Sequence, residues 1–312
     1  MRKILFHCTI GSHLYGLNTP TSDIDFFGVF APDEKELLGL NELKYIDNSV
    51  LTTRKNERNT NKDIDDKVFS IRKYIELLLG NNPNIIETLF IPEKNINVMD
   101  SRFKELIDNY PKFVSKRVYK TFNGYAKSQF KKLEVKSERY NALKLAINYL
   151  KVAMENNITH LSEDSSFGLN KHLNYYKKSK GSIKNFHKGM EVSKVYEILN
   201  REYDEYGWRA KTETFKNLHY DVKFAYHLVR IMLEANFLLD NGFLNFPFEG
   251  KEKKLLLSIK NGEREIDDIK KIYHDLSVVS NEIFEKSTLP DNPDYDWADN
   301  FLTKIHKKFI IK

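Results

Sequence analysis

Two acidic residues at the start of an apolar stretch constrain this chain more than any other feature. An apolar run over residues 4–10 leads through a Gly-Ser turn to a second run over residues 23–30, which opens on Asp23 and Asp25. Both runs are typical of strands, and side chains two positions apart on a strand point to the same face. We therefore expect these two carboxylates on one face, about 7 Å apart along the chain. Such a pair is repulsive unless a cation lies between its members.

The cation that suits two carboxylates is a hard divalent ion such as Mg²⁺, which prefers oxygen ligands. The turn just upstream, Gly11 and Ser12, offers backbone N–H groups and a hydroxyl, which suit a phosphate. Taken singly, a Gly-Ser pair is most often a turn, and Asp-x-Asp is most often a solvated strand end. Their combination between two apolar strands predicts a catalytic site for phosphoryl or nucleotidyl transfer.

The segment from Gly11 to Asp25 reads Gly-Ser-His-x-Tyr-Gly-Leu-x-Thr-Pro-x-Ser-Asp-Ile-Asp. It resembles the active-site signature of the DNA polymerase beta-type nucleotidyltransferases, and in particular the RlaP branch, for which a role in RNA repair has been suggested. The resemblance is strong over residues 1–92 and patchy beyond. It implies that Asp23 and Asp25 bind two Mg²⁺ ions, with Mn²⁺ as a substitute, and that Gly11 and Ser12 hold the β- and γ-phosphates of ATP or another NTP.

A third carboxylate would complete the metal site, and Asp63, Asp65 and Asp66 all precede the predicted third strand. Asp65 is preferred because the stretch from Asp65 to Tyr74 resembles the relatives' pattern of Asp, an aromatic residue and a Leu-Arg-Lys-Phe-like helix start. Asp63 is the alternative, since it lies on the same face if the strand begins earlier. Each of the three can instead be a charged strand cap.

A predicted helix near residues 218–240 is apolar around most of its circumference, as is typical of a buried helix. Lys223, His227 and Arg230 nevertheless fall on one narrow face of it. Buried cationic groups need anionic partners, and we expect an NTP triphosphate to supply them. Acidic side chains on a neighbouring element are the alternative. This run also resembles the relatives' second signature, with a departure at Phe224, where we expect His.

The net charge of +6 arises from 50 Lys and Arg against 44 Asp and Glu, an excess too small to establish a nucleic-acid partner. Basic residues nevertheless gather with aromatic ones over residues 112–136 and 171–188, and such mixtures can follow phosphates and stack bases. Lys127, Lys131 and Lys132 are the candidate RNA-binding residues, and a solvated helix face is the alternative. The aromatic residues of the first region are Phe113, Tyr119, Phe122, Tyr125 and Phe130.

The composition indicates a folded chain of 312 residues, long enough for two domains. No apolar run approaches the roughly 18–20 residues of a membrane span, so we expect no membrane partner. The N-terminus leads directly into a strand and lacks the features of a signal peptide. The single cysteine, Cys8, excludes an internal disulfide and suits a reducing, cytoplasmic location.

The pattern of elements predicts an α+β fold. Residues 1–100 are expected to form a minimal nucleotidyltransferase domain, a mixed sheet with flanking helices, in which Asn84 caps a helix. From about residue 101 the spacing is helical, including segments at 111–134 and 138–155. We expect residues 101–312 to form an all-helical domain that completes the nucleotide cleft and contacts the acceptor, with residues 158–189 as an excursion between helices.

These features together predict a magnesium-dependent nucleotidyltransferase of the EC 2.7.7 type. It would move a nucleoside monophosphate from an NTP to an acceptor hydroxyl, with the 3′ end of an RNA such as tRNA as the expected acceptor. Nucleotidylation of a protein or a small molecule, including AMP transfer, is an alternative that would use the same acidic residues. A non-catalytic nucleotide- or RNA-binding module is another. The sequence carries no signal for the oligomeric state.

Overall fold

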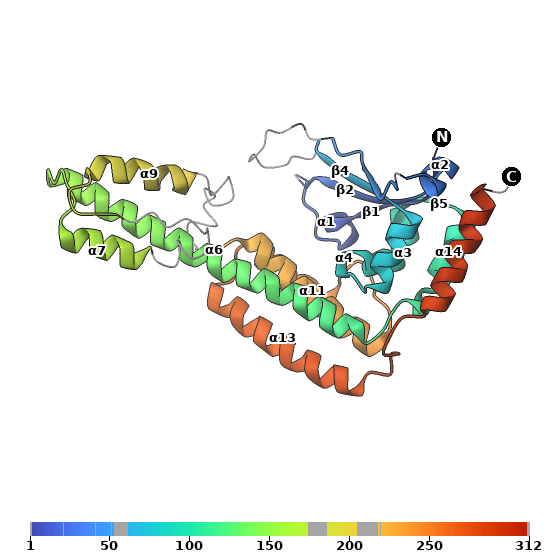
Figure 1. Cartoon of the computed structure of the whole chain (residues 1–312). Coiled ribbons are helices and arrows are strands. Elements are labelled where there is room, and N and C mark those ends of the chain that lie inside the picture. Colours follow the sequence, from blue (N-terminus) through green and yellow to red (C-terminus); the bar gives the residue numbers. More distant parts are fainter. Residues whose placement is uncertain are drawn as a thin grey trace.

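The computed structural model describes residues 2–20, 22–40, 42–50, 52, 62–173, 186–204, 218 and 220–310, with residues 134–139, 309 and 310 described by their backbone only. The molecule is elongated: a lobe that contains the sheet lies at one end, and a smaller helical lobe lies at the other (Figure 1). A long helix runs between them. No helix in the described ranges is long and apolar enough to cross a membrane.

The sheet has five strands in the order β3-β4-β2-β1-β5. The central strands β2 and β4 are parallel, whereas the other neighbours are antiparallel, so the predicted mixed sheet is confirmed. The edge strand β5 was not predicted, because four residues are too few to show a clear alternation. The strands are β1 (Lys3–Ile10), β2 (Ile24–Ala31), β3 (Tyr45–Asp47), β4 (Ile64–Ser70) and β5 (Ile96–Met99).

Helices cover the face of the sheet to which Phe27 points. Ser70 caps α3 (Ile71–Leu79) by accepting a hydrogen bond from the backbone N–H of Lys73. The buried Tyr74 of α3 lies with its ring 5.7 Å from that of Phe27. On the neighbouring α5 (Ser101–Asp108), Phe103 stacks on Phe6 of β1 at 4.8 Å. These aromatic contacts hold β1 and β2 against the helices and so fix the strand that carries Asp25.

The turn after α3 begins α4 (Pro83–Ile86) at a different residue from the one expected. Asn82, not Asn84, is the N-cap, since its side chain accepts a hydrogen bond from the Asn84 N–H at 3.1 Å. Proline is favoured at the first helical position, which makes the preceding residue the cap. The short 3₁₀ helix Glu87–Phe90 follows and buries Glu87.

The helical region packs directly onto the sheet lobe. The long α6 (Arg117–Glu155) is continuous where two segments were expected, and its first half packs against α11 (Val222–Asn241) and α13 (Ile266–Lys286). One apolar cluster includes residues from the strands, α3, α6 and α11, so the predicted boundary at residue 100 does not coincide with a break in the core. Two further helices belong to it, α12 (Gly250–Lys260) and α14 (Tyr295–Ile310).

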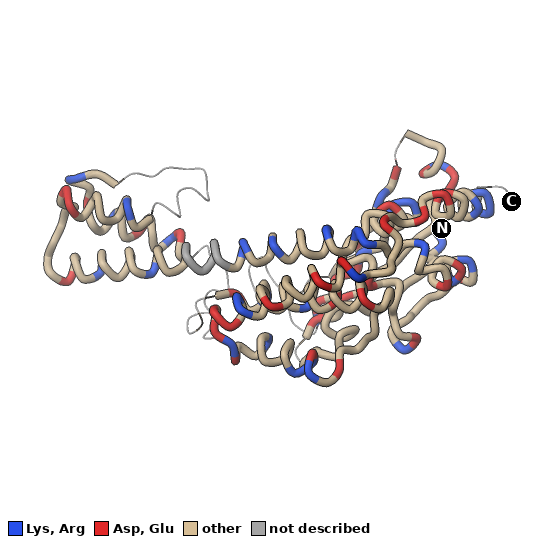
Figure 2. Tube along the Cα trace, turned by 90° about the horizontal axis from the view of Figure 1, so that it is seen from below, with Lys and Arg blue, Asp and Glu red and all other residues tan. Residues whose placement is uncertain are grey.

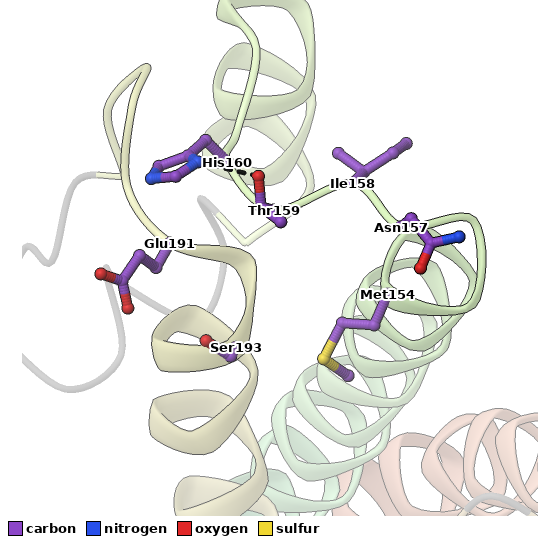
Figure 3. A pocket seen from close by; sticks show the side chains of 7 residues that line it. All are labelled: Met154, Asn157, Ile158, Thr159, His160, Glu191 and Ser193. Carbon is purple, nitrogen blue, oxygen red and sulfur yellow. Dashed lines mark hydrogen bonds between the residues drawn. The ribbon is translucent and has the colours of Figure 1, made fainter.

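A second apolar cluster forms the distal lobe, from the end of α6, α7 (Glu163–His172) and α9 (Val192–Asp204). Part of the expected excursion over residues 158–189 is therefore helical, and residues 174–185 lie outside the described ranges. A cavity of about 370 Å³ lies in this lobe, with Met154, His160 and Glu191 in its wall (Figure 3). It belongs to a core separate from the strands that carry the predicted acidic residues.

Candidate active site

The parallel pairing of β2 and β4 places two of the predicted acidic residues side by side. Asp25 is the second residue of β2, and its register partner on β4 is Asp65. Residues in register on neighbouring strands point to the same face of a sheet. Asp23 lies two positions before Asp25, outside the strand, because β2 begins at Ile24 and not at Asp23 as expected.

The electrostatic environment of Asp25 shows which charged groups surround it. Burial, together with the negative charges of Asp23 and Asp65, raises the pKa of Asp25 to about 6. The positive charges of Lys223 and Lys67 act in the opposite direction. The structure therefore brings all three predicted acidic residues and the first residue of the predicted cationic face into one group. Lys223 comes from α11, about 200 positions further along the chain.

Gly11 and Ser12 open the short helix α1 (Gly11–Leu14) directly against this group. Gly11 has a φ of +66°, and a Cβ placed on it would lie 2.1 Å from Oδ2 of Asp25. Only glycine allows both this backbone conformation and this approach. The Ser12 hydroxyl is buried and makes no hydrogen bond with the described residues. A buried hydroxyl without a partner is unfavourable, so this one is available for a ligand oxygen.

The three candidates for the third carboxylate lie in different environments. Asp63 is fully buried. It accepts one hydrogen bond from the Thr52 hydroxyl at 3.0 Å and a second, shorter one from the Thr52 backbone N–H. Asp66 lies 3.2 Å from Nε2 of His7. Asp65 is half exposed and accepts hydrogen bonds from Ser49 and Lys67. Its position beside Asp25 favours Asp65 over Asp63, which has a structural partner.

The carboxylates do not form a closed metal site as they stand. Among the described residues, no group of three or more His, Cys, Asp and Glu side chains is close enough to hold a metal ion. The Asp65 carboxylate is paired instead with Lys67, whose Nζ lies 3.1 Å away. The donors themselves suit Mg²⁺ or Mn²⁺, since carboxylate oxygens are the ligands these ions prefer. The raised pKa of Asp25 reflects its burial first and the negative charges of Asp23 and Asp65 second, and a bound cation would oppose both effects.

The three predicted cationic residues of α11 do not share one environment. Lys223 is exposed, and His227 is partly buried beside the ring of Tyr226. Arg230 is buried, with Nη1 donating at 2.7 Å to two carboxylates, those of Glu87 and Glu234. This differs from the expected triphosphate contact of Arg230 and matches the alternative of acidic partners. Helical spacing gives the face of a residue but not its depth or its neighbours.

The basic region on α6 presents lysines to solvent but not rings. Lys127, Lys131 and Lys132 are exposed and form no ion pair with the described residues, and Lys and Arg residues recur along this half of the helix (Figure 2). Its aromatic residues pack inward instead: Tyr119 stacks on Phe284 at 4.3 Å, Phe130 stacks on Tyr273 at 4.5 Å, and Phe113 and Phe122 are buried. The expectation of a stacking surface for bases is therefore wrong for these four rings. Three of them pack α6 against the core, and Phe113, just before the helix, is buried in the same core. Much of the second basic region, including Lys177, Lys178, Lys180 and Lys184, lies outside the described residues.

Lys67 is the site residue that sequence reasoning missed. It lies two positions after Asp65 on β4, so it shares the face of that residue. This alternation was visible in the sequence. A lysine beside two aspartates was indistinguishable from an exposed strand residue until the register placed Asp25 next to Asp65.

Comparison with known proteins gives first the class and then the family. The family that matches residues 1–304 is a DNA polymerase beta family, a class of nucleotidyltransferases. Its description is "RlaP: RNA repair pathway DNA polymerase beta family", and the chain belongs to this family. The resemblance seen in the motifs is thus confirmed. The chain is also similar to the uncharacterized 38.9 kDa protein in the nrdC-mobD intergenic region of Enterobacteria phage T4, with 24% identity over 334 residues and 97% of each chain covered.

Proposed function

We propose that this chain is a metal-dependent nucleotidyltransferase that moves a nucleoside monophosphate from an NTP to the 3′ hydroxyl of an RNA, with tRNA as the first acceptor to test. The observation that carries the proposal is the register pairing of Asp25 with Asp65 next to Gly11. It joins two carboxylates to a glycine turn at the end of one pair of strands. Membership of an RNA repair family supports RNA as the acceptor.

In this proposal the residues around Asp25 divide the work between metal and phosphate. Asp23 and Asp25 would hold two Mg²⁺ ions, and Asp65 would join them as the third carboxylate in place of its contact with Lys67. Bound there, the ions would supply acidity to the acceptor hydroxyl and neutralise charge on the triphosphate. The Ser12 hydroxyl and the N–H groups of the turn at Gly11 would hold the β- and γ-phosphates.

In the proposal, Lys223 and His227 of α11 orient the triphosphate. The positive charge of Lys223 already acts on Asp25. A phosphate bound beside Asp25 would therefore also lie within reach of Lys223. Alignment and charge neutralisation provide most of the catalysis in phosphoryl and nucleotidyl transfer. Arg230 is left out of this set because its guanidinium is already paired with two carboxylates.

The decisive experiment incubates the purified chain with each α-³²P-labelled NTP, Mg²⁺ and either deacylated tRNA or total RNA. Transfer of label to an RNA 3′ end supports the proposal. Label on a polypeptide or on a small molecule would replace RNA as the acceptor while keeping the chemistry. NTP binding without transfer to any acceptor would contradict catalysis and favour a binding module.

Substitution of Lys223 tests the phosphate contact from α11. We expect Lys223→Ala to weaken NTP binding by about 1.5–3 kcal/mol, a typical value for a charge-assisted hydrogen bond, and to leave binding of the nucleoside almost unchanged. Calorimetric titration of both ligands measures the difference. The control is Lys271→Ala, an exposed lysine of α13. An equal loss for nucleotide and nucleoside would remove Lys223 from the phosphate site.

Charge reversal on α6 tests the acceptor surface. Because each neutralised phosphate of single-stranded RNA contributes about 0.7 to the slope of log affinity against log salt, we expect Lys127→Glu, Lys131→Glu and Lys132→Glu together to flatten this slope and reduce transfer to RNA. The matched control reverses three exposed lysines of α13, Lys270, Lys271 and Lys286. A salt slope that is the same in both triple variants would exclude this face of α6.

A further inference from the structure

Three stretches that are far apart in the sequence meet in one buried group beside the candidate site. Tyr15 follows α1, Glu87 begins the 3₁₀ helix after α4, and Arg230 and Glu234 belong to α11. All four residues are at most 4% exposed. They form no part of the acidic group around Asp25, and nothing in the proposed chemistry uses them directly.

The contacts within this group are specific and connected. The Tyr15 hydroxyl donates to the Glu87 carboxylate, 2.8 Å from one oxygen and 3.0 Å from the other. Arg230 Nη1 donates to Glu87 and Glu234 at 2.7 Å each. The guanidinium also lies over the Tyr15 ring, 4.4 Å from its centroid. Tyr15 is thus held by its hydroxyl and by the face of its ring.

Because these four side chains are buried, breaking any contact among them would destabilise the protein. One guanidinium faces two carboxylates away from water. Burial raises the pKa of Glu234, the charge of Arg230 acts against this, and the charge of Glu87 adds to it. Glu87 accepts hydrogen bonds on both oxygens, and burial raises its pKa as well. Removing one partner would leave a buried polar group unsatisfied.

The position of Tyr15 connects this group to the nucleotide turn. Tyr15 is the C-cap of α1 and donates its backbone N–H to the carbonyl of Gly11 at 3.2 Å. Its ring packs beside those of Phe246 and Phe248, with centroids 5.7 and 6.0 Å away, and its carbonyl accepts a hydrogen bond from the Phe248 N–H. Arg230 lies two helical turns after Lys223 on α11. A shift of Tyr15 relative to Arg230 is therefore a shift of Gly11 and Ser12 relative to Lys223.

We infer that Tyr15, Glu87, Arg230 and Glu234 are positioning residues, which fix α1 against α11 so that Gly11 and Ser12 face Lys223 across the nucleotide site. That the site binds an NTP rests on the proposed function, whereas the contacts that join α1 to α11 do not. The inference gives Arg230 a role that acts through Tyr15 and Glu87, without contact with phosphate.

The test compares Tyr15→Phe, which removes the hydroxyl bonded to Glu87, with Tyr74→Phe. Tyr74 is also fully buried, and its hydroxyl lies 2.9 Å from that of Thr88, outside the group. Hydrogen exchange of peptides covering residues 11–17 and 222–227 is measured in both variants without nucleotide. We expect faster exchange in these peptides for Tyr15→Phe and not for Tyr74→Phe, at similar unfolding midpoints. Unchanged exchange in Tyr15→Phe would overturn the inference.

A second arm measures binding of a non-hydrolysable α,β-methylene ATP with Mg²⁺ to the same proteins. We expect Tyr15→Phe and Glu87→Gln to bind it about tenfold more weakly than the wild type, a usual size for coupling between sites, while Tyr74→Phe binds normally. Wild-type affinity in Tyr15→Phe would contradict the inference. If the wild type itself does not bind the nucleotide, the proposed function fails, and the exchange measurement alone decides the positioning role.

Discussion

Asp25→Asn is expected to lower nucleotidyl transfer at least about a thousandfold, because it removes an anionic ligand from the centre of the charge that the reaction must organise. Asp25 is in register with Asp65, and its carboxylate lies directly against Gly11. Single-turnover transfer of labelled NMP measures the loss. Asp23→Asn is expected to behave in the same way, since Asp23 would also be a metal ligand in the proposal.

The same substitution should not destabilise the protein. The pKa of Asp25 in the folded state, about 6, lies above its ordinary value of 3.8, so the stability that this group contributes falls as the pH rises through that interval. At pH 7 the neutral Asn is therefore expected to raise the free energy of unfolding by about 1–3 kcal/mol in the absence of metal. Urea unfolding of both proteins at pH 4 and pH 7 measures this change.

The matched control for the effect of Asp25→Asn on transfer is Asp66→Asn. Asp66 is the adjacent carboxylate on β4, but it points to His7 on the other face of the sheet. Its substitution should leave transfer near the wild-type rate. Loss of activity in Asp66→Asn equal to that in Asp25→Asn would show that any charge change in β4 disturbs the site, and the metal assignment would lose its support.

Gly11→Ala is the second substitution with a large expected effect. The added methyl group would lie 2.1 Å from Asp25 Oδ2, so α1 or the carboxylate must move, and the φ of +66° is unfavourable for alanine. Displacement of a catalytic group by about 1 Å can cost a hundredfold in rate, and we expect a loss of at least this size. Steady-state transfer kinetics, with NTP and acceptor varied in turn, measure it.

Gly189→Ala is the control for Gly11→Ala, because it introduces the same kind of backbone strain without a steric clash of the new Cβ. Gly189 has a similarly positive φ of +84°, but a Cβ on it would meet nothing within 4 Å. Gly189→Ala is expected to destabilise the distal lobe by about 1 kcal/mol and to leave transfer unchanged. If Gly11→Ala is as active as Gly189→Ala, the close approach of the turn to Asp25 has no catalytic importance.

The elements of the sheet lobe were largely predictable from the sequence because their signals are local. The two apolar runs predicted β1 and β2 to within one residue at each end. The continuity of α6 was not predictable in this way. A polar stretch in the middle of a helix is the same in sequence as a linker, and only packing on both sides keeps the helix unbroken.

The candidate site was predictable where its residues are neighbours in the chain. Asp23, Asp25, Gly11 and Ser12 come from one motif, and the structure groups the two aspartates with the glycine turn. Arg230 differs because its surroundings come from Glu87, which lies 143 positions away. Tyr119 and Phe130 differ for the same reason, since their partners belong to α13. A one-dimensional pattern contains no information on such partners.

The long helix α6 contributes to two separate apolar cores, so its length fixes the distance between them. Its 39 residues extend for about 58 Å, with one end fixed in the sheet lobe and the other in the distal lobe. Because an α-helix turns by about 100° per residue, one residue inserted between the two cores would rotate the distal lobe by that angle and advance it by about 1.5 Å. Every insertion therefore changes the distance of the distal lobe, and its orientation is nearly kept only when the insertion approximates whole turns, such as seven residues for about two turns.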